Sequence, residues 1–485
     1  MAPDVGAALD VLLDGALDEI VEVVLLRDGG ALEAHAVDGS VRFDRDGRVL
    51  DVRGRNPLAD QATDRFASLA DEIAGRHPRR DANSYPFAYE QVAQLFDHPA
   101  APDLCVVHTA AHNWEDQGGH RGEHGSLDVV QARAPFIIAG AGVRPLGMVD
   151  RACKLVDIAP TVLALLNAVE PRQTDGAVLD DVIAGGAGGA GGGEAPDQVV
   201  GFLWDGCNPN VLYDAVANGD APNVGRLMAM GTTFRHGAMA SLPTVTLANH
   251  TSILTGLHPG HHGILHNAWF DRRAGRQVIT NSPTTWHEAS SWLFPGVETI
   301  HDVVHRTWPG ACTASINEPT DAGADFSTFD FVRRGITLER PPAPDELPNA
   351  DQRFVRPVKE YRWSSRVDHT TVQQFVGLWS GHYLGTEWAR PKFTWCNFSL
   401  TDAAFHEGGP HSEIALASIR DSDARLGQIL DAVERSGAFD RTAFFLVADH
   451  GMEETDPGVN GDWGPVLRDA GIAHRDEAFG FLYLG

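Results

Sequence analysis

The positions of apolar residues predict strands and helices that alternate along most of the chain. Apolar runs typical of buried strands cover 103–110, 134–143, 198–205, 392–402 and 442–449. Helical spacing predicts helices at 5–26, 57–76, 157–166, 223–230, 246–255 and 412–435. An Asp-Gly turn within 41–52 indicates a hairpin, and 268–390 is irregular and rich in Trp and Pro. This alternation predicts an α/β fold with a mostly parallel sheet, and we expect a small cap within about 268–390.

A glycine-rich segment divides the chain. Residues 185–197, GGAGGAGGGEAPD, are almost all Gly and Ala and are expected to form a flexible tether. A tether of about thirteen residues spans roughly 20 Å on average. It either links two independent domains or joins two ends that lie on one face of a single domain. Composition alone leaves both interpretations open.

The charge balance limits the partners. Asp and Glu number 66 against 38 Lys and Arg, a formal charge of −28, so neither a nucleic-acid polymer nor a membrane is an expected partner. A small anionic substrate would need local positive charge, which bound metal ions provide. The five Cys form no CxxC pair, which argues against a disulfide framework or a thiolate zinc site. With no signal-like or membrane-spanning run, we expect a cytoplasmic protein of undetermined oligomeric state.

Acidic and imidazole side chains follow the predicted strands. Asp205 ends the strand after the tether, Asp402 and His406 are four positions apart, and Asp449 precedes His450. Open α/β sheets build their sites at such strand ends. Oxygen and imidazole ligands without thiolate suit zinc or a similar divalent ion, although each motif taken alone is also explained by an ordinary turn.

Thr246 begins a predicted helix. A Thr hydroxyl becomes a useful nucleophile only when it is activated, and both a metal ion and a helix N-terminus favour negative charge there. Two ions would hold the attacking and leaving oxygens of an in-line displacement at phosphorus. The alternative for Thr246, and for Thr244, is a helix cap.

The segment PTVTLANHTSILTGLHPGHHGILHN, 243–267, resembles the nucleophile segment of the nucleotide pyrophosphatase/phosphodiesterases of the alkaline phosphatase superfamily. The resemblance implies that Thr246 is the nucleophile and Asn267 the donor to a phosphoryl oxygen. FLWDG, DAAFHEGGP, FLVADHGM and His-Gly-Ser resemble the family's metal-binding motifs. They imply two divalent ions, with zinc expected. The ligands of one ion would be Asp205, Thr246, Asp449 and His450, and those of the other Asp402, His406 and His124.

The order of the motifs departs from the family pattern. The family's His-Gly motif follows Asp-His-Gly-Met, whereas His124 precedes the tether here. This order implies a circular permutation of an alkaline-phosphatase-like fold. Residues 1–183 would correspond to the family's C-terminal part, 184–197 to the tether and 198–485 to the N-terminal part, and both parts would form one catalytic domain.

The resemblance implies a two-metal hydrolase of phosphodiester or nucleotide pyrophosphate bonds that acts through a phospho-threonine intermediate. The alternatives on the same site are a phosphonoacetate-type phosphonate hydrolase and a phosphomonoesterase; an inactive metal-stabilised binding protein is another. The substrate would be a small phosphate ester or phosphonate. Leu247 stands where nucleotide-binding members carry an aromatic residue, so Trp269 and Phe270 are candidates for that role. His120 is a rival ligand, while His258, His261, His262 and His266 are expected to be loop or supporting groups.

Overall fold

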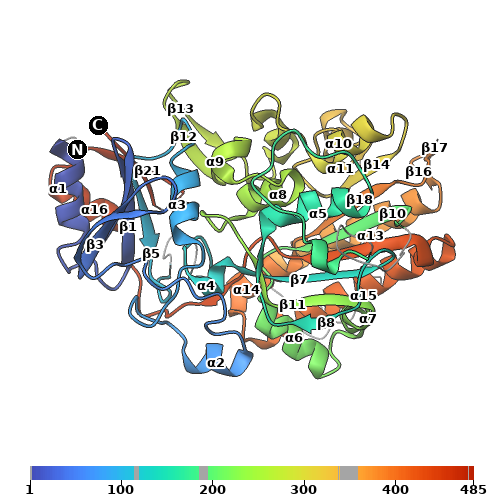
Figure 1. The fold of residues 1–485 in the computed structure, drawn as a ribbon, viewed down its shortest axis with the longest axis horizontal. Coiled ribbons are helices and arrows are strands. Elements are labelled where there is room, and N and C mark those ends of the chain that lie inside the picture. The colour runs from blue at the N-terminus through green and yellow to red at the C-terminus, as the bar shows by residue number, and fades with distance from the viewer. Residues whose placement is uncertain (1–2, 114–118, 185–194, 337, 339–358, 479) are drawn as a thin grey trace.

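Two large β-sheets, three two-stranded sheets and the helices around them make up the described part of the protein (Figure 1). The computed structural model describes residues 3–113, 119–184, 195–336, 338, 359–478 and 480–485. Most of the predicted tether therefore lies outside the described residues. The described helices include none that is both long and apolar enough to cross a bilayer.

The larger sheet has nine strands among the described residues. Its order is β15 (Phe326–Ser327), β14 (Thr313–Ile316), β18 (Phe393–Phe398), β10 (Gln198–Trp204), β19 (Thr442–Val447), β7 (Arg133–Gly140), β11 (Gly231–Met239) and β8 (Gly147–Val149), and β9 (Cys153–Lys154) also pairs with β11. Every pairing is parallel except the two that β7 makes with β19 and β11. The predicted α/β fold with a mostly parallel sheet is confirmed.

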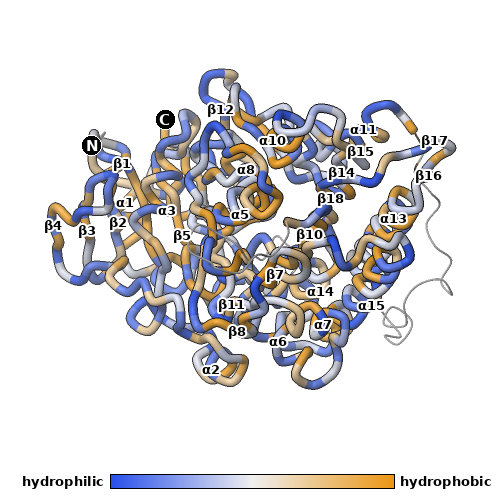
Figure 2. Tube along the Cα trace, turned by 45° about the vertical axis from the view of Figure 1, so that its right-hand side comes forward, coloured by the Kyte–Doolittle hydropathy of each residue, from blue (hydrophilic) through white to orange (hydrophobic). Residues whose placement is uncertain are grey.

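Helices cover both faces of this sheet, so its strands are apolar throughout. β18, β10 and β19 are buried along almost their whole length. On one face α5 (Ile158–Leu165) packs against α8 (Thr246–Thr255) and α10 (Ile300–Thr307). On the other, α15 (Glu413–Arg435) packs against α6 (Pro209–Ala217), α7 (Pro222–Met230) and α13 (Lys359–Trp379). Figure 2 shows apolar chain gathered around α5 and α8.

The smaller sheet is antiparallel and joins the two ends of the chain. Its order is β21 (His474–Glu477), β22 (Phe481–Leu484), β5 (Leu104–His108), β1 (Val21–Asp28), β2 (Ala31–Ala36), β3 (Gly39–Phe43) and β4 (Val49–Gly54). The predicted hairpin is confirmed as β3–β4, with Gly47 at φ +79° in its turn. The C-terminal hairpin thus pairs with strands from the first quarter of the chain.

Three predictions from the pattern were wrong in part. The helix expected at 5–26 is only α1 (Pro3–Leu12), because the Val-rich stretch after it is the buried strand β1. The helix expected at 57–76 is only α2 (Leu69–Ala74), since Asp60 binds the Ala62 N–H and forms a turn. The region 268–390 is not irregular throughout: β14, β15 and the long helix α13 belong to the main sheet and its helical layer.

The remaining predicted elements are confirmed within a few residues. They are the strands β5, β7, β10, β18 and β19 and the helices α5, α7, α8 and α15. Pro160 lies in the first turn of α5, and Gly256 ends α8 with φ +73°.

Candidate active site

Three parallel strands bring three carboxylates to one edge of the sheet. Asp205 follows β10 directly, and Asp449 lies two residues beyond β19. Asp402 does not end its strand as predicted. It lies in the first turn of α14 (Leu400–Gly408), because β18 stops four residues earlier. Since β18, β10 and β19 run in the same direction, all three side chains meet at their carboxyl ends.

Asp402, His406 and His124 meet on one side of this edge. Asp402 and His406 are one turn apart on α14, with His406 Nε2 3.3 Å from Asp402 Oδ1. His124 follows β6 (Gly122–Glu123), which pairs with β20 (Glu453–Glu454) just after the Asp449 loop. This pairing places His124 Nε2 3.8 Å from Asp402 Oδ1. The structure therefore brings His124 to two residues that lie far from it in the sequence.

Asp205, Asp449 and His450 meet on the other side. His450 Nε2 lies 3.1 Å from Asp449 Oδ2 and 3.7 Å from Asp205 Oδ1. Gly206 holds the turn after β10 at φ +63°, and its N–H donates to Asp449 Oδ1 over 3.0 Å. The rings of His124 and His450 stack with centroids 3.7 Å apart, so the two groups of residues are direct neighbours.

Backbone carbonyls fix how these three imidazoles face the site. Nδ1 lies 2.9 Å from Thr244 O in His124, 2.7 Å from Gly122 O in His406 and 2.8 Å from Gly451 O in His450. A carbonyl oxygen only accepts, so each Nδ1 carries the hydrogen and each Nε2 is left facing the carboxylates. Histidines that bind metal ions are oriented in this way.

Several buried polar atoms at the site have no hydrogen-bond partner among the described residues. They are Asp205 Oδ1, Asp402 Oδ1, Asp449 Oδ2 and His450 Nε2. Burial together with the charges of Asp449 and Asp402 raises the pKa of Asp205 to about 8. Leaving such atoms unpaired in the interior is costly, and divalent cations would satisfy them. The residues therefore fit a metal centre with oxygen and imidazole ligands.

Thr246 and Asn267 lie beside this centre. Thr246 is the first residue of α8, whose N-cap is Val245 and carries no side-chain cap bond. The Thr244 hydroxyl instead donates to Ser126 O and accepts from the Gly125 N–H, so neither Thr caps the helix. Asn267 Oδ1 accepts the Leu247 N–H over 3.0 Å, which ties Asn267 to the residue after Thr246 and leaves its amide N–H groups available.

Two cavities adjoin the centre. One, of about 140 Å³, is lined by Asp205, Thr246, Leu247 and the aromatic residues Trp286, Phe329 and Trp363. The other, of about 310 Å³, is lined by His120, His124, His266, Asn267 and His406. No Lys or Arg from the described part of the chain lines either cavity. Trp269 and Phe270 line neither cavity, and Trp269 is buried in the core, so the aromatic groups at Thr246 come from further along the chain.

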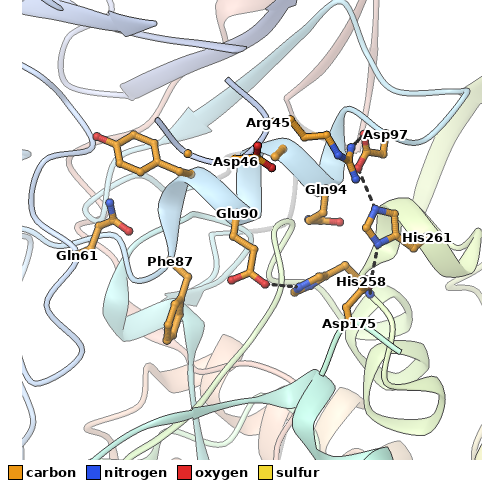
Figure 3. A pocket seen from close by; sticks show the side chains of 13 residues that line it. Arg45, Asp46, Gln61, Phe87, Glu90, Gln94, Asp97, Asp175, His258 and His261 are labelled. Atoms are coloured by element: carbon orange, nitrogen blue, oxygen red, sulfur yellow. Dashed lines mark hydrogen bonds and ion pairs between the residues drawn. The ribbon is translucent and has the colours of Figure 1, made fainter. Parts of the chain in front are cut away.

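The other histidines separate into distinct places. His120 lies beside Glu123, with its ring 4.5 Å from that of His406, and these three residues form a further group of possible metal ligands. His258 and His261 line a separate cavity of about 500 Å³ and pair with Glu90, Asp97 and Asp175 (Figure 3). His262 is buried against Ser252 in the core.

Three buried residues at the site were missed from the sequence. Asn249 accepts the Ser241 N–H and donates to three carbonyls, and it holds the loop that leads to Thr246. His250 approaches both Asp205 and Asp449 through Nε2, and Glu318 lies beside its Nδ1. The spacing of Asn249 and His250, one turn beyond Thr246, is the only sequence signal that could have found them. For Glu318 there is none.

The fold and this centre define an α/β protein with carboxylate and imidazole groups collected at parallel strand ends. The sequence profile described as type I phosphodiesterase/nucleotide pyrophosphatase matches residues 199–484, more than half of the chain. The chain therefore belongs to the type I phosphodiesterase/nucleotide pyrophosphatase family, which confirms the resemblance seen in its motifs.

Curated relatives with similar sequences carry the same family name. Ectonucleotide pyrophosphatase/phosphodiesterase family member 3 of Mus musculus is 23% identical over 239 residues, which cover 48% of this chain and 22% of that protein. An uncharacterised pyrophosphatase/phosphodiesterase of Schizosaccharomyces pombe is 23% identical over 57% of this chain and 47% of its own length. The chain thus matches less than half the length of these relatives.

Two solved structures match part of the chain at low identity. An inactive murine ectonucleotide pyrophosphatase/phosphodiesterase 5 in complex with AMP is 15% identical, with a TM-score of 0.36 over 53% of this chain and 57% of that one. Phosphonoacetate hydrolase from Sinorhizobium meliloti, in complex with phosphonoformate, is 22% identical, with a TM-score of 0.35 over 54% and 58%.

Proposed function

We propose that the protein hydrolyses phosphodiester or nucleotide pyrophosphate bonds through a covalent intermediate on Thr246. The observation that carries the proposal is the convergence of two carboxylate–imidazole groups with a Thr at the start of a helix. Asp205, Thr246, Asp449 and His450 would hold one divalent ion, and Asp402, His406 and His124 the other, with zinc expected. Such ions neutralise phosphoryl charge and lower the pKa of a bound hydroxyl.

The chain's own groups would guide the displacement at phosphorus. The Thr246 Oγ attacks phosphorus, the bond to the leaving oxygen breaks, and water later hydrolyses the phospho-threonine to restore the hydroxyl. The N-terminus of α8 favours negative charge at Thr246. Asn267 is held by the Leu247 N–H through its oxygen, so its amide N–H can donate to a phosphoryl oxygen.

The cavities favour diesters over the alternatives. A phosphomonoester or phosphonoacetate carries more negative charge than a diester, and each would call for a nearby Lys or Arg. Among the described residues none lines the two cavities. Trp286, Phe329 and Trp363 would contact an apolar or aromatic group of the substrate. They would take over the role of the aromatic residue that the family carries at the position of Leu247.

The test is hydrolysis of a chromogenic phosphodiester, a phosphomonoester and phosphonoacetate by zinc-loaded protein. We expect a preference for the diester that chelator abolishes. Thr246→Ala should lose at least about 10³-fold in kcat while it retains its metal ions, and Thr246→Ser should recover part of the rate.

Thr255→Ala is the matched control, because Thr255 is a buried Thr at the far end of the same helix and, among the described residues, its hydroxyl binds only Thr251 O and the Leu257 N–H. It should keep wild-type turnover. Turnover of phosphonoacetate alone, or full activity of Thr246→Ala, would overturn the proposal.

We also propose that the chain is circularly permuted, so that residues 1–183 and 198–485 form one catalytic domain. β7 lies between β19 and β11 in one sheet, and the two ends of the tether are near each other. The Ala184 N–H donates to Gly142 O, the neighbouring Ala141 N–H to Thr442 O, and the Asp197 N–H to Arg441 O. Both ends therefore lie beside the start of β19, a distance that the tether can span.

A protease site inserted within 185–194 tests this arrangement. After cleavage the two fragments should remain associated and active, because they share one sheet and one metal centre. Separation of two folded fragments under native conditions would support the two-domain interpretation instead.

A further inference from the structure

His250 has no assigned role, yet it lies at the centre of the site. It is one turn beyond Thr246 on α8, so both side chains project from the same face of the helix. Its Nε2 is 3.4 Å from Asp449 Oδ2 and 3.7 Å from Asp205 Oδ2. The side chain is fully buried, and it lines the cavity that holds Thr246.

These distances do not correspond to ordinary hydrogen bonds. His250 Nε2 is buried and has no hydrogen-bond partner among the described residues. Nitrogen–oxygen hydrogen bonds are usually about 2.7–3.2 Å long. Two atoms bound tetrahedrally to one zinc ion at about 2.0–2.2 Å lie roughly 3.4 Å apart. The distances of 3.4 and 3.7 Å from His250 Nε2 to the two carboxylates are close to that separation.

Glu318 lies on the other side of the His250 ring. Its Oε2 lies 2.9 Å from His250 Nδ1, and its Oε1 accepts the Thr320 N–H over 2.9 Å. The Thr320 hydroxyl in turn binds Thr251 on α8, so the loop after β14 is attached to the same helix. A carboxylate at Nδ1 leaves Nε2 as the atom that faces Asp205 and Asp449. Metal-bound histidines commonly have such a carboxylate behind them.

We propose that His250 is a further ligand of the ion held by Asp205 and Asp449, with Glu318 as its positioning residue. The inference rests on the proposed two-ion function and deepens it. The ion would then have two imidazole ligands, His250 and His450, in addition to the carboxylates. Such a set favours zinc, cobalt or a similar nitrogen-binding ion over magnesium or calcium, which prefer oxygen ligands.

The test is metal binding by the apo-protein, independent of turnover. Zinc is titrated against a chromophoric chelator, and cobalt is used as a spectroscopic probe of the ligand set. For His250→Ala we expect one of the two ions to bind at least about 100-fold more weakly, with a changed visible cobalt spectrum at that site. Glu318→Gln should lower the affinity for the same ion by about 10- to 100-fold, as is usual when a residue that hydrogen-bonds a metal ligand is changed.

Two further variants keep the test interpretable. His250→Gln preserves most of the side-chain volume and covers the case in which the Ala variant unfolds. His301→Gln is the matched control, because His301 on α10 is equally buried, has no hydrogen-bond partner among the described residues, and packs against Phe393 on β18, away from the metal centre. It should bind both ions normally.

The outcomes separate the two proposals. If wild-type protein binds two ions and the His250 variants bind both with unchanged affinity and cobalt spectrum, His250 is not a ligand and the proposed function stands. If wild-type protein binds no divalent ion, the two-ion function fails and the inference fails with it.

Discussion

Gly206 allows the turn after Asp205 to lie close to Asp402, and Gly206→Ala is the sharpest test of this geometry. Its φ of +63° lies in the left-handed region, and a Cβ there would be 2.7 Å from Asp402 Oδ1 and 3.1 Å from the Asp402 Cβ. The left-handed conformation alone costs an Ala residue about 1–2 kcal/mol.

The steric overlap adds a second effect. Carbon atoms in ordinary contact are about 3.5–4.0 Å apart, so Asp402 would have to move by roughly 0.5–1 Å. A misplacement of about 1 Å at a catalytic site can cost about 100-fold in rate. We therefore expect Gly206→Ala to lower kcat/KM for the diester by about 10- to 100-fold and to weaken binding of the ion at Asp402.

Gly219→Ala separates strain from overlap. Gly219 has φ +81°, but a Cβ at that position meets nothing within 4 Å. Both variants should lose similar stability from the backbone conformation, while only Gly206→Ala should lose activity. Steady-state kinetics, metal titration and thermal unfolding of the two variants measure this. Equal kcat/KM in the two variants would refute the argument that Asp402 depends on this close approach.

Two further predictions concern other groups. Hydrogen bonding to Asp175 outweighs burial and raises the pKa of His261, while the pKa of Asp175 is lowered. The pair therefore stabilises the fold most between about pH 4 and 6.5, so Asp175→Asn should cost about 1 kcal/mol near pH 5 and less at pH 9. Denaturant unfolding at both pH values, with exposed Asp440→Asn as control, checks this, and an equal loss at both would contradict it. Asn267→Ala should lower kcat by about 10²–10³-fold with both metal ions still bound, measured by kinetics and metal analysis; a loss below about 3-fold would argue against its donor role.

Local patterns in the sequence predicted the strands of the main sheet and the chemistry at their ends. A strand buried on both faces requires an unbroken apolar run, and the acid just after β10 or β19 is then placed by the parallel sheet itself. The pattern failed where an apolar run is equally compatible with two structures. The segment that follows α1 has the composition of a buried helix or a strand, and its pairing with β2 and β5 decides the outcome.

Contacts between distant segments could not be predicted from local patterns. His250 has an ordinary helical position, and its importance comes from Glu318, on a loop that tertiary packing brings to α8. The aromatic side chains beside Thr246 likewise come from three separate segments, represented by Trp286, Phe329 and Trp363. Their convergence depends on the whole fold, which spacing along the chain does not encode.

The position of β7 has a consequence for how the protein is made. Its neighbours β11 and β19 are both synthesised later, and β19 ends only at Val447. β11 can pair with β7 about halfway through synthesis, but the other edge of this apolar strand stays unpaired until nearly all of the chain has been made, because its pairing with β19 spans about three hundred residues. Chains with an unpaired strand edge are prone to aggregate before the partner strand has been synthesised. The yield of active protein should accordingly depend on slow synthesis or on chaperones that shield this strand, more than on the stability of the finished fold.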